Sequence, residues 1–433
     1  MSAAFDGTAI GWRARRYRRV PARVRLWFAA ALASLCLSPS AASAAVAHVA
    51  VRAATPAPEF AAALKPRLLA RMAALRVPGA IVLVDIPSVG TWLTALGKAD
   101  IETGAPMRTD DHMRIGSITK TLTATIVLEL VDQGKVGLDD PVSNYLRGVP
   151  NGANISVREL LNMTSGLQNF TESLKFNAAL DANPERVWAA NELLPYAFNP
   201  ALAVQTHPYF PPNQGFHYSN TNYLLLGEIA EKVTHTPLNV LFKRRIFNPL
   251  GMTHSELPKR SDASIPNPHP HGYNFGTNVD GAKAYFAALA GDKANAEVKA
   301  APGTVPHDAT RWSTSYTWAD GSAISTAGDL LIWAKALGTG RLLSAWVQQQ
   351  RVAFSPAGNY GLGIEHAPFG GLIGHNGAIP GFQSFMGYAP KTGSTVIVLA
   401  NLQLGPNVYL GDGLPADELA KIIAQYKPLA GAL

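Results

Sequence analysis

Cysteine, charge and long apolar runs are all scarce in this sequence of 433 residues. The single cysteine, Cys36, lies in a predicted leader, so the mature chain would have neither a disulfide nor a thiol nucleophile. Charged residues make up 15% of the chain and hydrophobic residues 47%, a balance that excludes a disordered protein. No repeat of fixed period is visible, which argues against solenoids and propellers. A chain of this length can bury one large core shared by two sub-domains.

The first 44 residues are predicted to be a cleaved signal peptide. Seven arginines precede the apolar run Leu26–Leu37, which is too short to span a membrane, and Ala42-Ser43-Ala44 provides a cleavage signal. We therefore expect a secreted or periplasmic protein without a stable membrane anchor after cleavage. The leader holds seven arginines and one aspartate, so it carries six of the seven net positive charges. The nearly neutral mature chain gives no reason to expect a nucleic-acid partner.

Hydrophobic periodicity predicts strands at both ends of the mature chain and helices between them. The predicted strands are 80–86, 92–96, 383–388 and 395–400, and the predicted helices are 56–75, 118–133, 157–163, 223–233, 238–247, 327–337 and 415–426. The weakly patterned segment 274–312 is expected to form loop and short helix. We therefore predict an α/β (α+β) fold with an antiparallel sheet flanked by the terminal helices. Residues 45–433 would form one domain, with its α/β part at about 55–135 and 320–428 and a mainly helical, all-α insertion at about 136–319.

The segment GSITK places Ser117 at the start of a buried helix and Lys120 three residues later, on the same helix face. Free N–H groups and the positive end of a helix dipole at this position would stabilise a developing oxyanion. Burial and the dipole should both lower the pKa of Lys120, which would ease its use as a base. One Ser-x-x-Lys pair is also expected by chance in a chain of this length, with Ser117 then a helix cap and Lys120 solvated.

Two further motifs, each found once, have the residue types needed to complete a catalytic site. FHYSNTNY contains Tyr218, a phenol able to relay a proton, and Asn220, an amide able to bind a substrate amide. GHNG, which is predicted to lie just before a strand, contains His375, for a proton network or a substrate carboxylate, and Gly377, for close approach of a substrate backbone. Singly, each motif is better explained by a helix cap, a packed tyrosine or a surface histidine at a turn. Their combination with Ser-x-x-Lys on separate predicted elements favours one active site.

With these motifs, the chain resembles the serine β-lactamase and DD-peptidase superfamily, in particular class C β-lactamases, related esterases and secreted D-alanyl-D-alanine carboxypeptidases. The likeness runs from about Pro56 to Tyr426 and is carried by MRIGSITKTLTATIVLELVDQGKVGLDDPVSNYL, ISVRELLNMTSGL, YSNTNYLLLGEIAEKVT, IFNPLGMTHS, STAGDLLIWAKAL, YGLGI, GHNGAIPGF and VIVLAN. The carboxypeptidases are the most similar, since they too use His-x-Gly where the lactamases have Lys-Thr-Gly. The resemblance implies a β-lactamase/transpeptidase-like fold and a metal-independent serine hydrolase without cofactors. Its substrate would be a small peptide, amide, ester or β-lactam, and we expect a monomer.

The resemblance also implies roles for the reacting groups. Ser117 would attack the substrate carbonyl and form an acyl-enzyme. Lys120 and Tyr218 would move its proton, and the choice of base between them stays open. The backbone N–H groups of Ser117 and Ala378 would form the oxyanion hole, and Asn220 would bind the amide on the acyl side of the substrate.

The same resemblance assigns His375 to the place of the motif lysine and Trp318 to an aromatic position in the substrate cleft. One feature departs from carboxypeptidase-like members, which carry an arginine shortly before His-x-Gly. The segment 360–374 has no Arg or Lys, but contains Glu365 and His366. This departure leaves room for an amidase, an aminopeptidase or an esterase, unless Arg311 takes the missing role.

Four alternatives to a carboxypeptidase-like enzyme stay open, and the resemblance implies the first three. A class C-like β-lactamase or an esterase would use the same catalytic set. A non-catalytic penicillin-binding protein would keep Ser117, Lys120 and Tyr218 but never release the acyl group. A zinc hydrolase would need ligands such as His269 and His271 of PHPHGY, but no further ligand motif accompanies them.

The string PKTGS, at residues 390–394, contains the Lys-Thr-Gly signature of the lactamases. It lies between two predicted strands, and proline followed by a polar pair and glycine is typical of a turn. We therefore predict that Lys391 lies at a hairpin tip in water and that GHNG takes the role of the signature.

Overall fold

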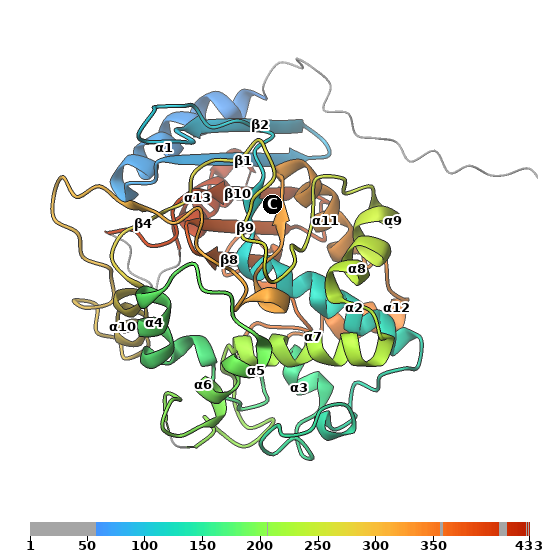
Figure 1. Ribbon diagram of the computed structural model, residues 1–433. Coiled ribbons are helices and arrows are strands. Elements are labelled where there is room, and N and C mark those ends of the chain that lie inside the picture. The colour runs from blue at the N-terminus through green and yellow to red at the C-terminus, as the bar shows by residue number, and fades with distance from the viewer. Residues whose placement is uncertain (1–57, 206, 356–357, 407–413, 430, 432) are drawn as a thin grey trace, which may run out of the picture. The chain divides into compact units, whose positions relative to one another are not determined.

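The structure is a computed structural model that describes residues 58–205, 207–355, 358–406, 414–429, 431 and 433 (Figure 1). The predicted signal peptide, residues 1–44, and the first residues of the helix predicted from Pro56 lie outside the described residues. The division into a cleaved leader and one domain with a helical insertion stays a prediction.

A sheet of six antiparallel strands joins the N-terminal and C-terminal parts of the described chain. Its order is β2-β1-β10-β9-β8-β7, and its strands are β1 Gly79–Ile86, β2 Gly90–Gly97, β7 Glu365–His366, β8 Ile373–Ile379, β9 Phe382–Tyr388 and β10 Thr395–Ala400. Strand β1 pairs with β10 from Ala80 opposite Ala400 to Asp85 opposite Thr395. The predicted antiparallel sheet, built from strands at both ends of the chain, is confirmed.

Both faces of this sheet are buried, because successive side chains of each central strand enter two different cores. In β1, Ile81 and Leu83 belong to one core, whereas Val82 and Val84 belong to the other. The core that contains Val82 and Val84 is covered by the two terminal helices, α1 Glu59–Leu75 and α13 Pro415–Ala424, which contact each other. The core that contains Ile81 and Leu83 includes residues of α2 Thr119–Asp132 and α11 Ala327–Thr339, and α11 packs on the strands from that side (Figure 1).

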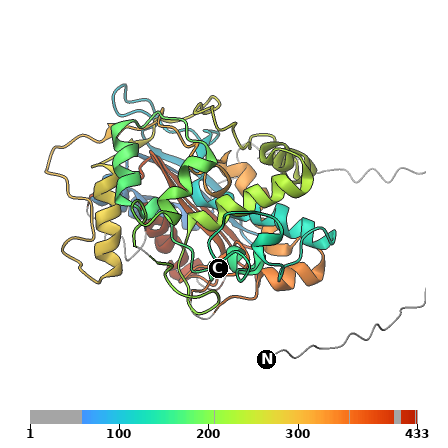
Figure 2. The same cartoon turned by 60° about the horizontal axis from the view of Figure 1, so that its bottom comes forward.

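The middle of the chain is mostly helical and extends the core around α2. Helix α7 Asn220–Thr234 packs against α2. The other elements are α3 Val157–Leu161, α4 Leu174–Ala182, α5 Ala190–Leu193, α6 Pro195–Phe198, α8 Leu238–Phe242, α9 Asn248–Leu250, α10 Asn278–Leu289, α12 Ala345–Arg351 and the short strands β3 Met113–Arg114, β4 Tyr273–Asn274, β5 His307–Asp308 and β6 Ile324–Ser325. Figure 2 shows α4 and α10 side by side. The weakly patterned segment 274–312 thus contains a helix, as predicted, and this helix packs on α4.

One prediction about the sheet is incomplete: GHNG does come before the predicted strand, β9, but it also lies inside a strand that was not predicted, β8. Two glycines and two polar residues hide the strand pattern, although the pleat holds Asn376 opposite Phe385 and Gly377 opposite Ser384 of β9. The predicted turn at PKTGS is confirmed, because it joins β9 to β10 and Lys391 is exposed. PKTGS is therefore a connection between strands, whereas GHNG lies within a strand that pairs with β9 and contacts the turn of Ser117.

Candidate active site

Ser117 lies in a turn of 3-10 helix, Gly116–Ile118, that leads directly into α2. Helix α2 is buried on almost every side, so Lys120, one turn along, has no exposed surface. Its ammonium nitrogen Nζ donates hydrogen bonds to Ser117 Oγ at 2.9 Å and to the backbone carbonyl oxygen of Asp320 at 2.9 Å. Burial lowers the pKa of Lys120 to about 8, against the opposing effect of the Asp320 carboxylate. The predicted Ser117–Lys120 contact is present, and the solvated-lysine alternative is wrong.

The turn of Ser117 packs closely against β8. A glycine on each side, Gly116 in the turn and Gly377 in β8, leaves no room for a larger residue. A β-carbon added to Gly116, where φ is +51°, would lie 2.7 Å from the backbone nitrogen of Ala378. A β-carbon added to Gly377 would lie 2.9 Å from the backbone nitrogen of Ser117. Ser384 Oγ donates a 2.7 Å hydrogen bond to the Ile115 carbonyl, which fixes the turn to β9. The backbone nitrogens of Ser117 and Ala378 thus lie on adjoining segments, as their predicted oxyanion-hole role requires.

Tyr218 lies just before α7 and packs its ring over Lys120, with Nζ 4.9 Å from the ring centroid. Burial and the Glu365 carboxylate raise the pKa of Tyr218 well above its usual value, whereas the nearby Ser117 side chain lowers it. Among the described residues, the buried Tyr218 hydroxyl has no hydrogen-bond partner of ordinary geometry. The phenol therefore lies beside both Ser117 and Lys120, with its hydroxyl free to bond a reacting atom.

Asn220, the first residue of α7, is held by the segment that precedes α4. Its side-chain nitrogen Nδ2 donates to Thr171 Oγ1 at 2.9 Å, and its backbone N–H donates to Asn169 Oδ1 at 3.1 Å. Its carbonyl oxygen Oδ1 is buried and has no partner among the described residues. That free acceptor can bind the N–H of a substrate amide, so the predicted role of Asn220 is chemically available.

His375 is a buried member of β8, with a side chain that has no exposed surface. Its ring nitrogen Nδ1 lies 2.6 Å from the Asn376 carbonyl oxygen, which can only accept, so Nδ1 carries the proton. Nε2 then accepts a 3.0 Å hydrogen bond from the Tyr360 hydroxyl. Burial, together with the Lys120 charge, lowers the pKa of His375 to about 3, so the imidazole is neutral. The sequence-based alternative of a surface histidine at a turn is wrong.

Acidification should destabilise the fold through His375. Because the folded-state pKa of about 3 lies below the ordinary value of 6.5, the unfolded chain binds a proton between these pH values that the folded chain does not. From about pH 6.5 to about pH 5, the wild type should lose roughly 2 kcal/mol more stability than His375→Asn. Urea denaturation of both proteins at the two pH values measures this difference. Equal pH dependence in the two proteins would contradict the assignment of a neutral, buried His375.

Four residues around this cluster were not singled out as functional from the sequence. Tyr360 bonds His375, and Glu365 Oε1 lies 3.6 Å from His375 Nε2. Asp417 accepts a 3.0 Å hydrogen bond from Asn376, and Asp320 lies against Lys120. In the sequence, Asp320 could have been noticed as an acidic residue in the largely apolar stretch TWADGSA. The nearness of Tyr360, Glu365 and Asp417 to the site depends on the folding together of β7, β8 and α13.

Other predicted residues lie elsewhere. The Trp318 indole is buried, with the Arg260 guanidinium 3.8 Å from its ring centroid, and it packs against Gly227 of α7, so its place in a cleft stays a prediction. Arg311 is exposed, and none of the contacts found for Ser117 or Lys120 involves it. His271 bonds Asp308 at 2.7 Å. Over the described ranges, no three metal-ligating side chains gather in one place, and no helix is long and apolar enough to cross a membrane.

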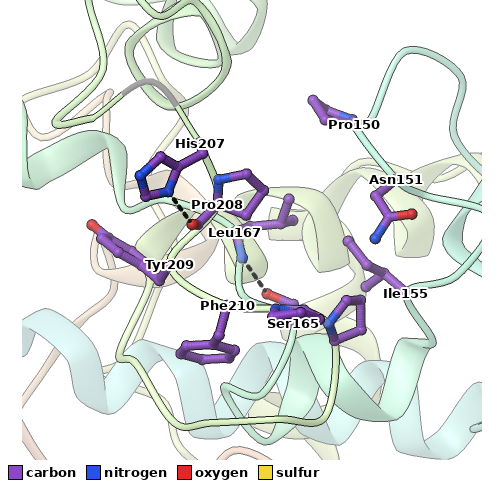
Figure 3. Close-up of a pocket in the computed structure, with 11 residues that line it drawn as sticks. Pro150, Asn151, Ile155, Ser165, Leu167, His207, Pro208, Tyr209 and Phe210 are labelled. Atoms are coloured by element: carbon purple, nitrogen blue, oxygen red, sulfur yellow. Dashed lines mark hydrogen bonds between the residues drawn. The ribbon is translucent and has the colours of Figure 1, made fainter.

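A separate pocket opens beside the loop that leads to Tyr218 (Figure 3). Its wall is rich in proline and aromatic side chains, and it is lined by Pro150, Asn151, Ile155, Ser165, Leu167, His207, Pro208, Tyr209, Phe210, Pro211 and Pro212. None of the predicted catalytic residues lines it. Tyr209 links it to the site, because its hydroxyl donates to Glu172 at 2.5 Å and accepts from the backbone N–H of Asn169, the residue that holds Asn220.

Comparison with known proteins places this site in a family. A family model described as Beta-lactamase matches residues 67–419. Over 290 residues the chain is 27% identical to the putative penicillin-binding protein PbpX of Bacillus subtilis, covering 67% of this chain and 62% of that protein. It is 24% identical over 360 residues to a D-aminopeptidase of Brucella anthropi, covering 80% of this chain and 62% of the relative. The chain thus spans less than two thirds of these curated relatives.

Solved structures give the same result. The D-amino acid amidase from Ochrobactrum anthropi SV3, complexed with D-phenylalanine, is 28% identical with a TM-score of 0.66, over 85% of this chain and 99% of the amidase. A D-stereospecific amidohydrolase from Streptomyces sp. is 29% identical with a TM-score of 0.65, over 80% of this chain and 95% of the amidohydrolase. Since the family model covers most of the chain, this protein belongs to the Beta-lactamase family, within the serine β-lactamase and transpeptidase-like superfamily of hydrolases.

Proposed function

We propose that this protein is a serine peptidase or amidase that works through an acyl-enzyme on Ser117, in the manner of D-alanyl-D-alanine carboxypeptidases. The observation that carries the proposal is the 2.9 Å hydrogen bond between buried Lys120 and Ser117 at the start of α2. A nucleophile within hydrogen-bond reach of a base is the recurring arrangement of covalent catalysis. No cofactor is required by this chemistry.

In the proposed reaction, Ser117 Oγ attacks the carbonyl carbon, and its proton passes to the Lys120–Tyr218 pair. The pair then gives the proton to the leaving amine as the C–N bond breaks, which leaves the acyl group on Ser117. The backbone N–H groups of Ser117 and Ala378 stabilise the oxyanion, and Gly377 leaves room for the substrate beside β8. The close packing of these two segments supports this role. A side chain at Gly116 would collide with the backbone nitrogen of Ala378, and one at Gly377 would collide with that of Ser117.

The remaining residues would position the substrate and the proton network. Asn220 offers its free carbonyl oxygen to the acyl-side amide, which its unpartnered state supports. The ring centroid of His375 lies 6.2 Å from that of Tyr218. Because the imidazole is neutral, it adds no charge beside the Tyr218 phenol. Water then releases the acyl group.

A second candidate, an amidase or aminopeptidase for D-amino acid derivatives with a free amine, is favoured by one observation. The residues from 360 to 374 supply no cation for a substrate carboxylate, and Glu365, whose side chain is 29% exposed, lies 3.6 Å from His375. Burial and the Asp417 carboxylate raise the pKa of Glu365 to about 8, so its attraction for an ammonium group and its repulsion of a terminal carboxylate grow as the pH rises through that value. Relatives named D-aminopeptidase and D-amino acid amidase make this candidate more specific.

We also propose that the protein acts outside the cytoplasm, after removal of residues 1–44, as the arginine-rich start, short apolar run and A-x-A signal indicate. N-terminal sequencing of protein recovered from a secreting host tests this. A mature chain that begins near Ala45 is expected, and an uncleaved chain kept in the cytoplasm would contradict it.

A matched substrate panel tests the reaction class. D-alanyl-D-alanine peptides are compared with their C-terminal amides, N-acetylated with free-amine D-amino acid amides, and both with short esters and cephalosporins. A carboxypeptidase needs the free carboxylate, whereas the second candidate needs the free amine and loses its preference in Glu365→Gln.

Other outcomes of the panel decide against these proposals. Fast release of opened cephalosporin with little peptide turnover would assign a lactamase, and turnover of esters alone would assign an esterase. A stable β-lactam adduct without turnover of any substrate would assign a non-catalytic penicillin-binding protein.

A further inference from the structure

Lys120 has a second, deeper neighbour that the proposed reaction does not use: the carboxyl group of Asp320. Asp320 is 2% exposed and lies in the turn of 3-10 helix Trp318–Asp320, which contacts both α2 and α7. Its Oδ1 lies 3.7 Å from Lys120 Nζ, and its backbone oxygen accepts the 2.9 Å hydrogen bond described above. One residue thus touches Lys120 twice, once through the backbone and once through a charge.

The backbone contact alone would be enough to orient Lys120, so the carboxyl group calls for a separate reason. Burying a carboxyl group costs free energy unless it is paired or hydrogen-bonded. Yet Asp320 Oδ2 has no hydrogen-bond partner among the described residues, and burial raises the pKa of Asp320. An acid kept in such an unfavourable place, beside the lysine that contacts Ser117, is expected at a functional site.

The charged and titratable groups around the pair come from several elements. Lys120 faces Tyr218, Tyr223 and, at longer range, Glu365 and His375. Asp320 faces Arg260, whose guanidinium covers Trp318, and Tyr316 of its own segment.

Arg260 is itself shared with two acids of α7, Glu228 and Glu231. Among all these groups, Asp320 is the carboxylate within ion-pair distance of Lys120 in the described part of the chain.

We infer that Asp320 is a positioning residue for the proposed reaction, holding the Lys120 amino group against Ser117 Oγ and balancing its charge. The inference rests on the proposed function and goes beyond it. When Lys120 is an ammonium, the carboxylate offsets its charge in a site that water does not reach. When Lys120 is neutral, the Asp320 backbone oxygen still accepts its hydrogen bond, so the nitrogen keeps its place beside Ser117.

Asp320→Asn tests the inference, because the amide keeps the shape of the side chain and removes the charge. Without the carboxylate, the Lys120 ammonium is less stable. The limb of the kcat/KM pH profile that reports Lys120 should therefore move to lower pH by at least about one unit. The kcat should fall while KM changes little, and Asp320→Glu should restore the wild-type profile in part. Asp320→Ser serves as a second neutral variant if the asparagine protein does not fold.

Glu228→Gln is the matched control, since Glu228 is a partly buried acid that faces Arg260 but has no contact with Lys120. Its profile should match the wild type. Superimposable profiles for wild type and both neutral variants at Asp320 would overturn the inference, as would an equal shift in Glu228→Gln. Mass spectrometry of Ser117 acylation separates the two levels: an acylated Ser117 with an unshifted profile defeats the Asp320 role alone, whereas turnover independent of Ser117 defeats the proposed function.

Discussion

Ser117→Ala is expected to lower kcat/KM for the best substrate at least about 10³-fold, because no other group takes over the attack on the carbonyl. The fold should be unaffected. Ser117 is partly exposed, and the Lys120 ammonium that donates to its hydroxyl keeps its 2.9 Å bond to the Asp320 backbone when that hydroxyl is removed. Steady-state kinetics measure the loss, and thermal denaturation measures stability.

Ser156→Ala provides the contrasting control for this variant. Ser156 caps α3 by accepting a hydrogen bond from the Glu159 backbone N–H, so its loss should cost about 1 kcal/mol of stability and leave kcat/KM unchanged. A Ser117→Ala enzyme that keeps most of its activity would show that Ser117 is only part of a helix start.

Tyr218→Phe should lower kcat by roughly 10²- to 10⁴-fold with little change in stability. The first effect follows if the phenol transfers a proton between Ser117 and the substrate. The second follows because the buried hydroxyl makes no hydrogen bond of ordinary geometry within the described part of the chain, so its removal breaks none. Kinetics and denaturation of the same preparation separate the two effects.

Tyr223→Phe is the matched substitution, because this tyrosine also lies over Lys120 but bonds the Leu161 carbonyl at 2.9 Å. Removing its hydroxyl breaks one of the two hydrogen bonds that the Leu161 carbonyl accepts, the other coming from the Gly363 N–H at 3.2 Å, and should cost about 1 kcal/mol of stability, with a far smaller effect on kcat. If the two tyrosine variants have equal kcat values, Tyr218 has no special part in the reaction.

Local sequence patterns predicted much of the fold. Nearly continuous apolar runs in 80–86 and 395–400 marked strands that pair as β1 and β10, and the apolar run after Ser117 marked α2. These signals are strong because both faces of the sheet and nearly all of α2 are buried. Strand β8 escaped because GHNG replaces branched side chains with glycines that the close approach of Ser117 requires.

The site was predictable where its residues stand in short motifs and was missed where tertiary contacts create it. The Ser117–Lys120 pair follows from helical spacing alone. The burial of His375, its bond from Tyr360 and the nearness of Glu365 depend on β7 pairing with β8. Asp320 meets Lys120 across 200 residues of sequence, a contact that no local pattern encodes.

PKTGS and GHNG, the two candidates for the signature motif, show the difference between local and tertiary information. PKTGS matches the lactamase signature but forms the exposed β9–β10 turn, and GHNG lies on β8 against the turn of Ser117. Turn chemistry identified the former from the sequence. The position of the latter required the register of β8 on β9, in which Gly377 stands opposite Ser384.

The most direct test of the central claim is peptide mapping by mass spectrometry after brief reaction with a fluorescent penicillin or an activated ester. Our account predicts an acyl group on Ser117 of the wild-type protein, found on the peptide that contains GSITK, and no adduct on Ser117→Ala. An adduct on a different residue, or equal labelling of the two proteins, would contradict it.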